Sequence, residues 1–255
     1  MAQWGEVFGC DQPVALVTGS GAPRVGRAVL ELLAARGCRA VVHANRACDE
    51  AAATAQRLRD AGVAATHVCG DLTDESTARR VVRDAAACWG RLDVVVNAAA
   101  IWERKPLEAV TADDVRRHFE VNAMATFVTA QEAGLLMVAQ PSGGVIINVG
   151  DWAVARPYVD YAAYFPSKGA VESLTRSLAV ELAQRNPRVR VNAVLPGPVM
   201  LPPDLPQAER DAAIAGTLVK REGTPRHVAE AVLALVENDF ITGVCLPVDG
   251  GRRLA

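Results

Sequence analysis

A tyrosine and a lysine four residues apart are the side chains in this sequence best suited to move a proton. Tyr164 and Lys168 have this spacing, at the end of the stretch from Asp151 to Lys168. On a helix, positions i and i+4 share a face, so the phenol and the ammonium would point the same way. A nearby cation favours phenolate and lowers the pKa of a tyrosine. The pair therefore predicts a general acid or base at Tyr164.

This interpretation requires a helix that begins close to Tyr164. Pro166 is compatible with such a helix only in its first turn, where the missing N–H removes no intrahelical bond. The same spacing also occurs in ordinary exposed helical pairs, so the motif gains meaning only from the elements around it.

A glycine-rich turn near the start of the chain has the features of a phosphate cradle. The apolar run Pro13–Val17 has the length of a strand, and Thr18–Gly26 follows it before a helix-like stretch at Arg27–Arg36. A strand, a glycine-rich turn and a helix N-terminus place backbone N–H groups against a phosphate. A plain tight turn between packed elements is the alternative.

The end of the second predicted strand, Arg39–His43, indicates which dinucleotide would bind. An acidic residue at this position accepts hydrogen bonds from the adenosine ribose, whereas an arginine accommodates a 2′-phosphate. No carboxylate occurs before Asp49, and His43, Asn45 and Arg46 offer donors instead. The sequence predicts NADP(H), unless Arg46 simply faces solvent.

Apolar runs of strand length alternate with helix-like stretches along the rest of the chain. Further strands are expected at 64–69, 92–96, 144–149, 189–194 and 244–248. Helices are expected at 49–61, 75–89, 112–138 and 225–237, and another begins within 151–168 and ends at 183. This alternation predicts an α/β fold with a parallel sheet covered on both faces. We expect one domain over residues 1–255, with an N-terminal arm at 1–12. The segment 199–221 carries no readable motif and is expected to close over the substrate.

Composition excludes several classes of function. Apolar residues make up 51% of the chain and the formal net charge is -2, so neither nucleic acid nor an anionic membrane is an expected partner. No signal-peptide pattern opens the chain, and no apolar run is expected to span a bilayer. The six cysteines form no C-x-x-C pair and are expected to be reduced thiols in a cytoplasmic protein, with no disulfide and no zinc site.

Seven short motifs, in order, together resemble those of the short-chain dehydrogenase/reductase family. They are the T-G-rich turn at 18–26, G-D-L at 70–72, N-A-A-A at 97–100, Asn122, Y-x-x-x-K at 164–168, P-G at 196–197 and D-G-G at 249–251. The resemblance covers nearly the whole chain. It implies a Rossmann-type, doubly wound parallel sheet, a nicotinamide cofactor and a homotetramer.

The resemblance also implies roles for individual residues. The turn with Gly19 and Gly26 would hold the pyrophosphate, Asp71 the adenine and Lys168 the nicotinamide ribose, while Asn122 would support a proton-relay water. The full set of implied cofactor contacts is Gly19, Ser20, Arg24, Val25, Gly26, His43, Asn45, Arg46, Asp71, Leu72, Asn97, Ala98, Tyr164, Lys168, Pro196 and Gly197. The implied substrate contacts are Arg24, Trp102, Asp151, Tyr164 and Met200, and the implied catalytic residues are Asp151, Tyr164, Lys168 and Asn122. No metal is expected.

The chain departs from the usual family pattern most clearly at Asp151, which stands where a catalytic serine is expected. With Arg24 in the glycine turn and Trp102 after N-A-A-A, this aspartate resembles the pteridine reductase branch. A serine hydroxyl donates to a carbonyl oxygen that becomes an alkoxide, whereas an ionised aspartate opposes that charge. A ring nitrogen that must gain a proton suits a carboxylate better.

The sequence therefore predicts an NADPH-dependent reductase that transfers hydride to a C=N bond of a pterin-like heterocycle, with Tyr164 as proton donor. One alternative is a carbonyl reductase, of ketones or 3-oxoacyl groups, that keeps Asp151 protonated. A second alternative is a non-catalytic NADP(H)-binding regulator.

Overall fold

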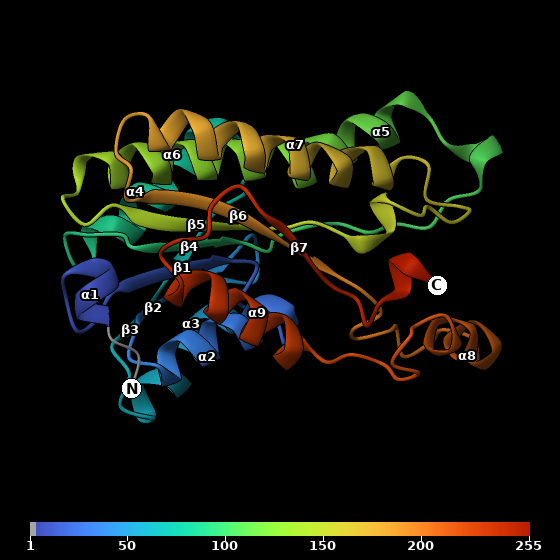
Figure 1. The fold of residues 1–255 in the computed structure, drawn as a ribbon, viewed down its shortest axis with the longest axis horizontal. Coiled ribbons are helices and arrows are strands. Elements are labelled where there is room, and N and C mark those ends of the chain that lie inside the picture. The colour runs from blue at the N-terminus through green and yellow to red at the C-terminus, as the bar shows by residue number, and fades with distance from the viewer. Residues whose placement is uncertain (1–3) are drawn as a thin grey trace.

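Seven parallel strands form one sheet across residues 4–255, which are the residues described by this computed structural model (Figure 1). The strands are β1 (Val14–Thr18), β2 (Arg39–Ala44), β3 (Ala65–Cys69), β4 (Val94–Asn97), β5 (Gly144–Val149), β6 (Val189–Pro196) and β7 (Cys245–Val248). Their order in the sheet is β3-β2-β1-β4-β5-β6-β7. The central strands are buried on both faces, which explains their continuous apolar runs.

Helices cover both faces of this sheet. They are α1 (Trp4–Phe8), α2 (Val25–Ala35), α3 (Cys48–Asp60), α4 (Glu75–Ala87), α5 (Ala112–His118), α6 (Ala125–Ala139), α7 (Tyr164–Ala183), α8 (Gln207–Ala215) and α9 (Pro225–Glu237). In Figure 1, α4, α5, α6 and α7 lie above the sheet and α2, α3 and α9 below it. The predicted α/β fold with a parallel sheet is confirmed.

The strand order produces the crevice in which a dinucleotide could lie. From β1 the chain moves outward to β2 and β3, then returns to place β4 on the other side of β1. The segments that follow β1 and β4 therefore diverge at the carboxyl ends of neighbouring strands. Ligands of open α/β sheets bind at this kind of reversal.

The long helix expected at 112–138 is divided into three parts. Phe119–Met124 adopts a π-helix between α5 and α6, and Asn122 lies within it. A π-helical turn commonly marks a functional position in a helix. The whole stretch Ala112–Ala139 is the one helix of the described chain that is long and apolar enough to cross a membrane, contrary to the expectation. Because 61% of its apolar window is buried against the rest of the fold, we interpret it as a core helix.

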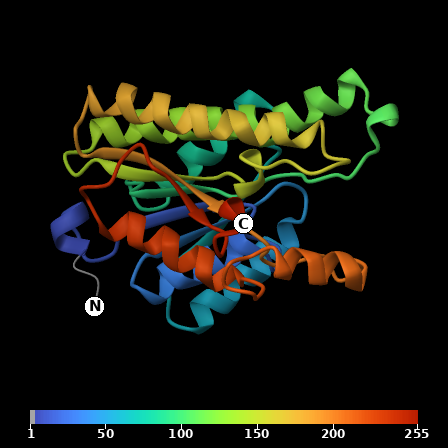
Figure 2. The ribbon, with the colours of Figure 1, turned by 45° about the vertical axis from the view of Figure 1, so that its right-hand side comes forward.

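Two segments without a readable pattern contain helices. In the expected N-terminal arm, Trp4 and Phe8 of α1 are buried, and the Trp4 indole donates to the carbonyl of Arg36 at 2.7 Å; residues 1–3 lie outside the described range. The segment 199–221 contains α8, which projects at the carboxyl end of the sheet (Figure 2). The single-domain organisation agrees with the prediction.

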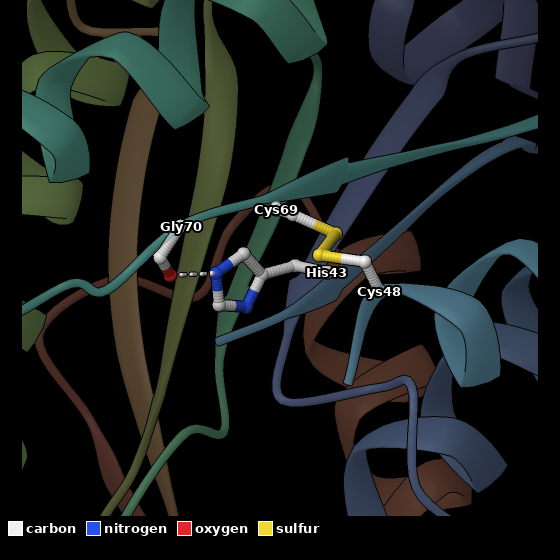
Figure 3. Close-up of a disulfide and its surroundings, with 4 residues drawn as sticks. All are labelled: His43, Cys48, Cys69 and Gly70. Atoms are coloured by element: carbon white, nitrogen blue, oxygen red, sulfur yellow. Dashed lines mark hydrogen bonds between the residues drawn. A yellow bond between two sulfur atoms is a disulfide. The ribbon is translucent and has the colours of Figure 1, made fainter. Parts of the chain in front are cut away.

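The expectation of six reduced cysteines is wrong for two of them. Cys48 and Cys69 form a disulfide, with their Cα atoms 5.9 Å apart (Figure 3). The parallel pairing of β2 with β3 sets Ala44 opposite Cys69, and α3 begins four residues after Ala44. Strand register thus brings together two cysteines whose 21-residue separation carries no disulfide signal in the sequence. Cys10, Cys38, Cys88 and Cys245 are free.

Candidate active site and cofactor groove

The predicted helix begins at Tyr164, and Pro166 lies in its first turn. Tyr164 and Lys168 are both buried. The Tyr164 hydroxyl donates to Oδ2 of Asp151 at 2.7 Å, and Nζ of Lys168 donates to the carbonyl of Val149 at 2.8 Å. The end of β5 therefore brings the carboxyl group to the tyrosine and anchors the lysine beside it.

Asp151 begins a short loop that holds its carboxyl group in place. Its Oδ1 accepts from the backbone N–H of Ala153 at 2.8 Å, at the start of the 3-10 helix Trp152–Val154. Oδ2 remains for Tyr164. One oxygen thus orients the carboxyl group and the other faces the phenol.

Burial dominates the electrostatics of these three side chains. It raises the pKa of Asp151 above its ordinary value, although the Ala153 and Tyr164 hydrogen bonds and the charge of Lys168 oppose this shift. Burial also lowers the pKa of Lys168 to about 8, an effect that Asp151 reduces. A carboxyl with a raised pKa keeps its proton to higher pH.

The expected lowering of the Tyr164 pKa is wrong for this structure. Burial, followed by the charge of Asp151, raises the pKa of Tyr164 well above 10. The reason is geometric, because the phenol faces the carboxyl group of Asp151 and the ammonium of Lys168 bonds a carbonyl instead. The phenol of Tyr164 therefore keeps its proton to higher pH than an ordinary tyrosine.

Asn122 connects the loop after β4 to the start of α7. Its Oδ1 accepts from the N–H of Ile101, while its Nδ2 donates to the carbonyl of Ile101 and to Oγ of Ser167, all within 2.9–3.0 Å. Because Ser167 precedes Lys168, this network fixes the backbone that carries the lysine. The side chain is already occupied, and its role beside a relay water stays a prediction.

An aromatic cluster borders the tyrosine. Trp102 is 41% exposed and stacks on Tyr161 with 4.8 Å between ring centroids and 12° between planes. Tyr161 in turn lies edge-on to Tyr164 and Tyr158. Sequence reasoning selected Trp102 but missed Tyr158 and Tyr161, whose signal was only their position ahead of Tyr164. The stacked pair of Trp102 and Tyr161 thus forms an aromatic surface next to Tyr164, and Tyr158 stands nearly perpendicular to Tyr161.

The glycine turn after β1 fits a diphosphate. Gly19 has φ +68°, and a Cβ there would lie 3.0 Å from Cα of Ala99, so only glycine allows this close approach. A Cβ on Gly26 would meet the Gly19 carbonyl at 3.1 Å. Arg24 is the N-cap of α2, and its side chain makes no cap hydrogen bond. The first backbone N–H groups of the helix therefore remain available for an anion.

Three of the predicted cofactor contacts have buried side chains that support the groove from within. The His43 ring accepts from the N–H of Gly19 and lies 3.1 Å from the carbonyl of Gly70 (Figure 3). Burial lowers the pKa of His43 to about 4, so the ring is neutral. Ser20 bonds Val17 and His43 backbone groups, and Asn97 bonds Asn148 and Thr129. These side chains cannot also donate to a 2′-phosphate, so only their backbones remain for the cofactor.

Asn45, Arg46 and Asp71 lie together at the adenosine end of the groove. Hydrogen bonds from Thr73 lower the pKa of Asp71, and Asn45 and the charge of Arg46 lower it further. Both Asn45 and Arg46 are exposed. The roles of these residues toward an adenine and a 2′-phosphate stay predictions.

The remaining predicted contacts are distributed around the same edge of the sheet. Ala98 follows β4, where its N–H bonds Oγ1 of Thr18. Pro196 ends β6, and Gly197 packs so closely on Asp249 that a Cβ would lie 2.5 Å from its Cα. Met200, in the segment before α8, is half-exposed and has φ +52°. Val25 begins α2 and Leu72 is buried after β3.

The arrangement thus combines a glycine turn at a strand reversal with buried side chains of Tyr164, Lys168 and Asn122. A family model described as enoyl-(acyl carrier protein) reductase matches residues 22–253. The chain belongs to the short-chain dehydrogenase/reductase family.

Related proteins extend over almost the whole chain. A Streptomyces violaceoruber protein, named as a ketoacyl reductase of the granaticin polyketide synthase, is 38% identical over 96% of this chain and 97% of its own. A cis-4-hydroxycyclohexanecarboxylate dehydrogenase of Sinomonas cyclohexanicum is 36% identical over 97% of this chain and 98% of its own. The crystal structure of a dehydrogenase/reductase from Sinorhizobium meliloti superposes with a TM-score of 0.88 at 30% identity, covering 99% of both chains.

Membership of this family makes the protein an oxidoreductase that acts on a small molecule with a nicotinamide cofactor. By name, these relatives are a ketoacyl reductase and a dehydrogenase of cis-4-hydroxycyclohexanecarboxylate. They favour the carbonyl alternative over the pterin substrate that the sequence placed first.

Proposed function

We propose that this protein is an NADPH-dependent carbonyl reductase in which a protonated Asp151 replaces the usual serine. The observation that carries the proposal is the 2.7 Å hydrogen bond between Tyr164 and Asp151, inside a buried site that raises the pKa of both groups. Two protonated oxygens then meet at one point, where a carbonyl oxygen can be received.

The chemistry of a neutral Asp151 resolves the conflict between a carboxylate and a developing alkoxide. A neutral carboxyl group can accept from the Tyr164 hydroxyl and still donate its own proton. That proton can stabilise the negative charge that grows on the carbonyl oxygen. Tyr164 supplies the proton that completes the alcohol, and the Lys168 ammonium keeps the local potential positive. The nicotinamide, when bound, supplies the hydride.

The preference for NADPH rests on the adenosine end of the groove. An exposed arginine and an exposed asparagine follow β2, and no carboxylate occurs there before Asp49. A 2′-phosphate would be attracted to Arg46, whereas the bare ribose of NADH would lack its usual acidic partner. His43 acts here only through the backbone that it supports.

Pterin reduction is the second candidate, and Asp151 itself favours it. The flat surface of Trp102, stacked on Tyr161, suits a planar heterocycle. A pterin nitrogen could take its proton from the same carboxyl group. A non-catalytic regulator is the third candidate, although the tyrosine, lysine and asparagine are all in place.

The test is NADPH oxidation measured with a panel of ketones, including 4-oxocyclohexanecarboxylate, and with oxidised pterins. We expect the protein to reduce ketones. We also expect it to bind NADPH more tightly than NADH, and Arg46→Asp should narrow or reverse this difference in affinity. Tyr164→Phe should keep NADPH binding but reduce turnover by roughly 10²–10⁴-fold, as expected for a lost general acid. Pterin turnover without ketone turnover would transfer the assignment to the second candidate. Binding of NADPH with no turnover on either class would support a regulator.

A further inference from the structure

A cavity of about 320 Å³ lies next to the proposed active site, between the Asp151 loop, α8 and the end of the chain. Its lining includes Trp152, Tyr158, Arg156 and Arg252. Trp152 directly follows Asp151, and Tyr158 packs edge-on against Phe165, the residue after Tyr164. One short loop therefore presents the proposed catalytic carboxyl group at one end and this cavity at the other.

Two guanidinium groups line the cavity together with Ala255, the last residue of the described chain, and no Asp or Glu side chain lines it. Within residues 4–255, neither Arg156 nor Arg252 forms an ion pair. The guanidinium of Arg252 lies 5.0 Å above the Trp152 ring and donates to carbonyls near the end of α8. Burial, then the like charge of Arg156, lowers the pKa of Arg252, so each cation lies in the field of the other.

Two such cations in one partly enclosed cavity favour an anion. Arg252 is held rigidly by Trp152 and by the α8 carbonyls, so its orientation requires little further ordering. Arg156 is exposed and forms no side-chain contact described in this structure, so it is free to close onto a ligand. Guanidinium groups bind carboxylates, sulfonates and phosphates through paired N–H donors.

We propose that this cavity binds an acidic group of the substrate, so that the enzyme prefers oxo acids over neutral ketones. The substrate's carbonyl would lie at Tyr164 and its carboxylate between Arg156 and Arg252. The inference depends on the proposed reductase function for the identity of the ligand. Its test measures ligand binding and does not require turnover.

The test compares 4-oxocyclohexanecarboxylate with its methyl ester, which has nearly the same shape and no charge. Dissociation constants are measured by calorimetry on the NADPH-loaded protein at low and high salt, and kcat/KM is measured in parallel. The acid should bind roughly tenfold more tightly than the ester, as for a hydrogen bond to a charged group. High salt should reduce that preference.

Arg156→Ala is the principal variant, because the exposed side chain supports no other contact. It should remove most of the preference for the acid, and Arg156→Lys should restore only part of it. Arg252→Lys provides a second variant that keeps the charge near α8. Arg253→Ala, next to Arg252 but outside the cavity lining, is the matched control and should leave the preference unchanged.

The results separate this inference from the proposed function. Equal binding of acid and ester, or a preference that survives Arg156→Ala, would overturn the acidic subsite even if both ketones are reduced. Preferential binding of the acid without turnover of either ketone would retain the subsite and contradict the reductase assignment.

Discussion

At the scale of single residues, the unusual feature of this protein is a buried carboxyl group bonded to its proposed proton donor. Burial favours the neutral form of Asp151. The same burial keeps Tyr164 protonated and brings the pKa of Lys168 down to about 8. Asp151 and Tyr164 therefore keep their protons to higher pH than usual, whereas Lys168 loses its proton at lower pH than an ordinary lysine.

The pH dependence of ketone reduction should report this state of Asp151. Because its pKa is raised, the neutral carboxyl is present at low pH and is lost as pH rises through the folded-state pKa. Ketone turnover should therefore fall across that range, and fall again above about pH 8 as Lys168 loses its charge. Rate profiles over a broad pH range provide the measurement.

Two substitutions of Asp151 test whether this residue causes the decrease in turnover at lower pH, which we call the lower limb of the profile. Asp151→Ser restores a hydroxyl donor and should support ketone reduction without the lower limb. Asp151→Asn cannot exchange a proton, so it should also lack that limb while keeping the one near pH 8. A lower limb that persists in both variants would show that a different group controls it.

At the scale of elements, the disulfide ties together the two segments that border the adenosine end of the groove. Cys48 opens α3 two residues after Arg46, and Cys69 ends β3 two residues before Asp71. The Gly70 N–H also bonds the carbonyl of Ala44 at 3.1 Å. The covalent bond therefore restricts motion between Arg46 and Asp71.

Reduction of this disulfide should lower stability and weaken cofactor binding. A cross-link closing a loop of about this length contributes roughly 3 kcal/mol to the free energy of unfolding. We expect a lower thermal midpoint and a several-fold weaker NADPH dissociation constant in dithiothreitol. Cys48→Ser should reproduce both changes and no longer respond to reductant.

Cys88→Ser is the matched control, because Cys88 is an exposed free cysteine on the other side of the sheet from α3. It should behave as the unmodified protein in both redox states. Alkylation followed by mass measurement shows which thiols are free in each sample. Equal NADPH affinity in oxidised and reduced protein would contradict a role for the disulfide in the groove.

At the scale of the whole molecule, the outer layer formed by α6 and α7 has large apolar side chains at its surface. Leu135 of α6 is 43% exposed and Val180 of α7 is 65% exposed. Exposed apolar side chains also occur elsewhere in the described chain, for example at Val159 and Phe240, so the expectation of a subunit interface here rests on the family resemblance. The homotetramer implied by the family resemblance would place such a surface between subunits.

A charged side chain introduced into this layer should therefore lower the number of subunits in the oligomer. Val180→Asp is expected to lower the molar mass measured by light scattering, because a buried unpaired carboxylate destabilises an interface. Leu107→Asp, at a similarly exposed position in the short 3-10 helix Leu107–Ala109, is the control and should not change the mass. A protein that is already a monomer before substitution would contradict the tetramer.

The sequence by itself determined the order of elements and pointed to Tyr164 as the candidate proton donor. Apolar runs and turn residues predicted the strands and most helices, because local periodicity reflects burial on one or both faces. Gly144–Val149 and Pro225–Glu237 agree with prediction at both ends. The spacing of Tyr164 and Lys168 was sufficient to place them on one helical face.

Only the tertiary structure decided which partner each reactive group meets. Tyr164 faces Asp151 instead of Lys168, His43 supports the glycine turn from inside, and Cys48 reaches Cys69. These contacts join segments whose distance is set by strand register and by the path of loops, and neither leaves a periodic signal in the sequence. The shifts in pKa follow the same rule, since burial depends on everything that packs around a group. The chemistry of each residue is therefore local, but its protonation state is a property of the fold.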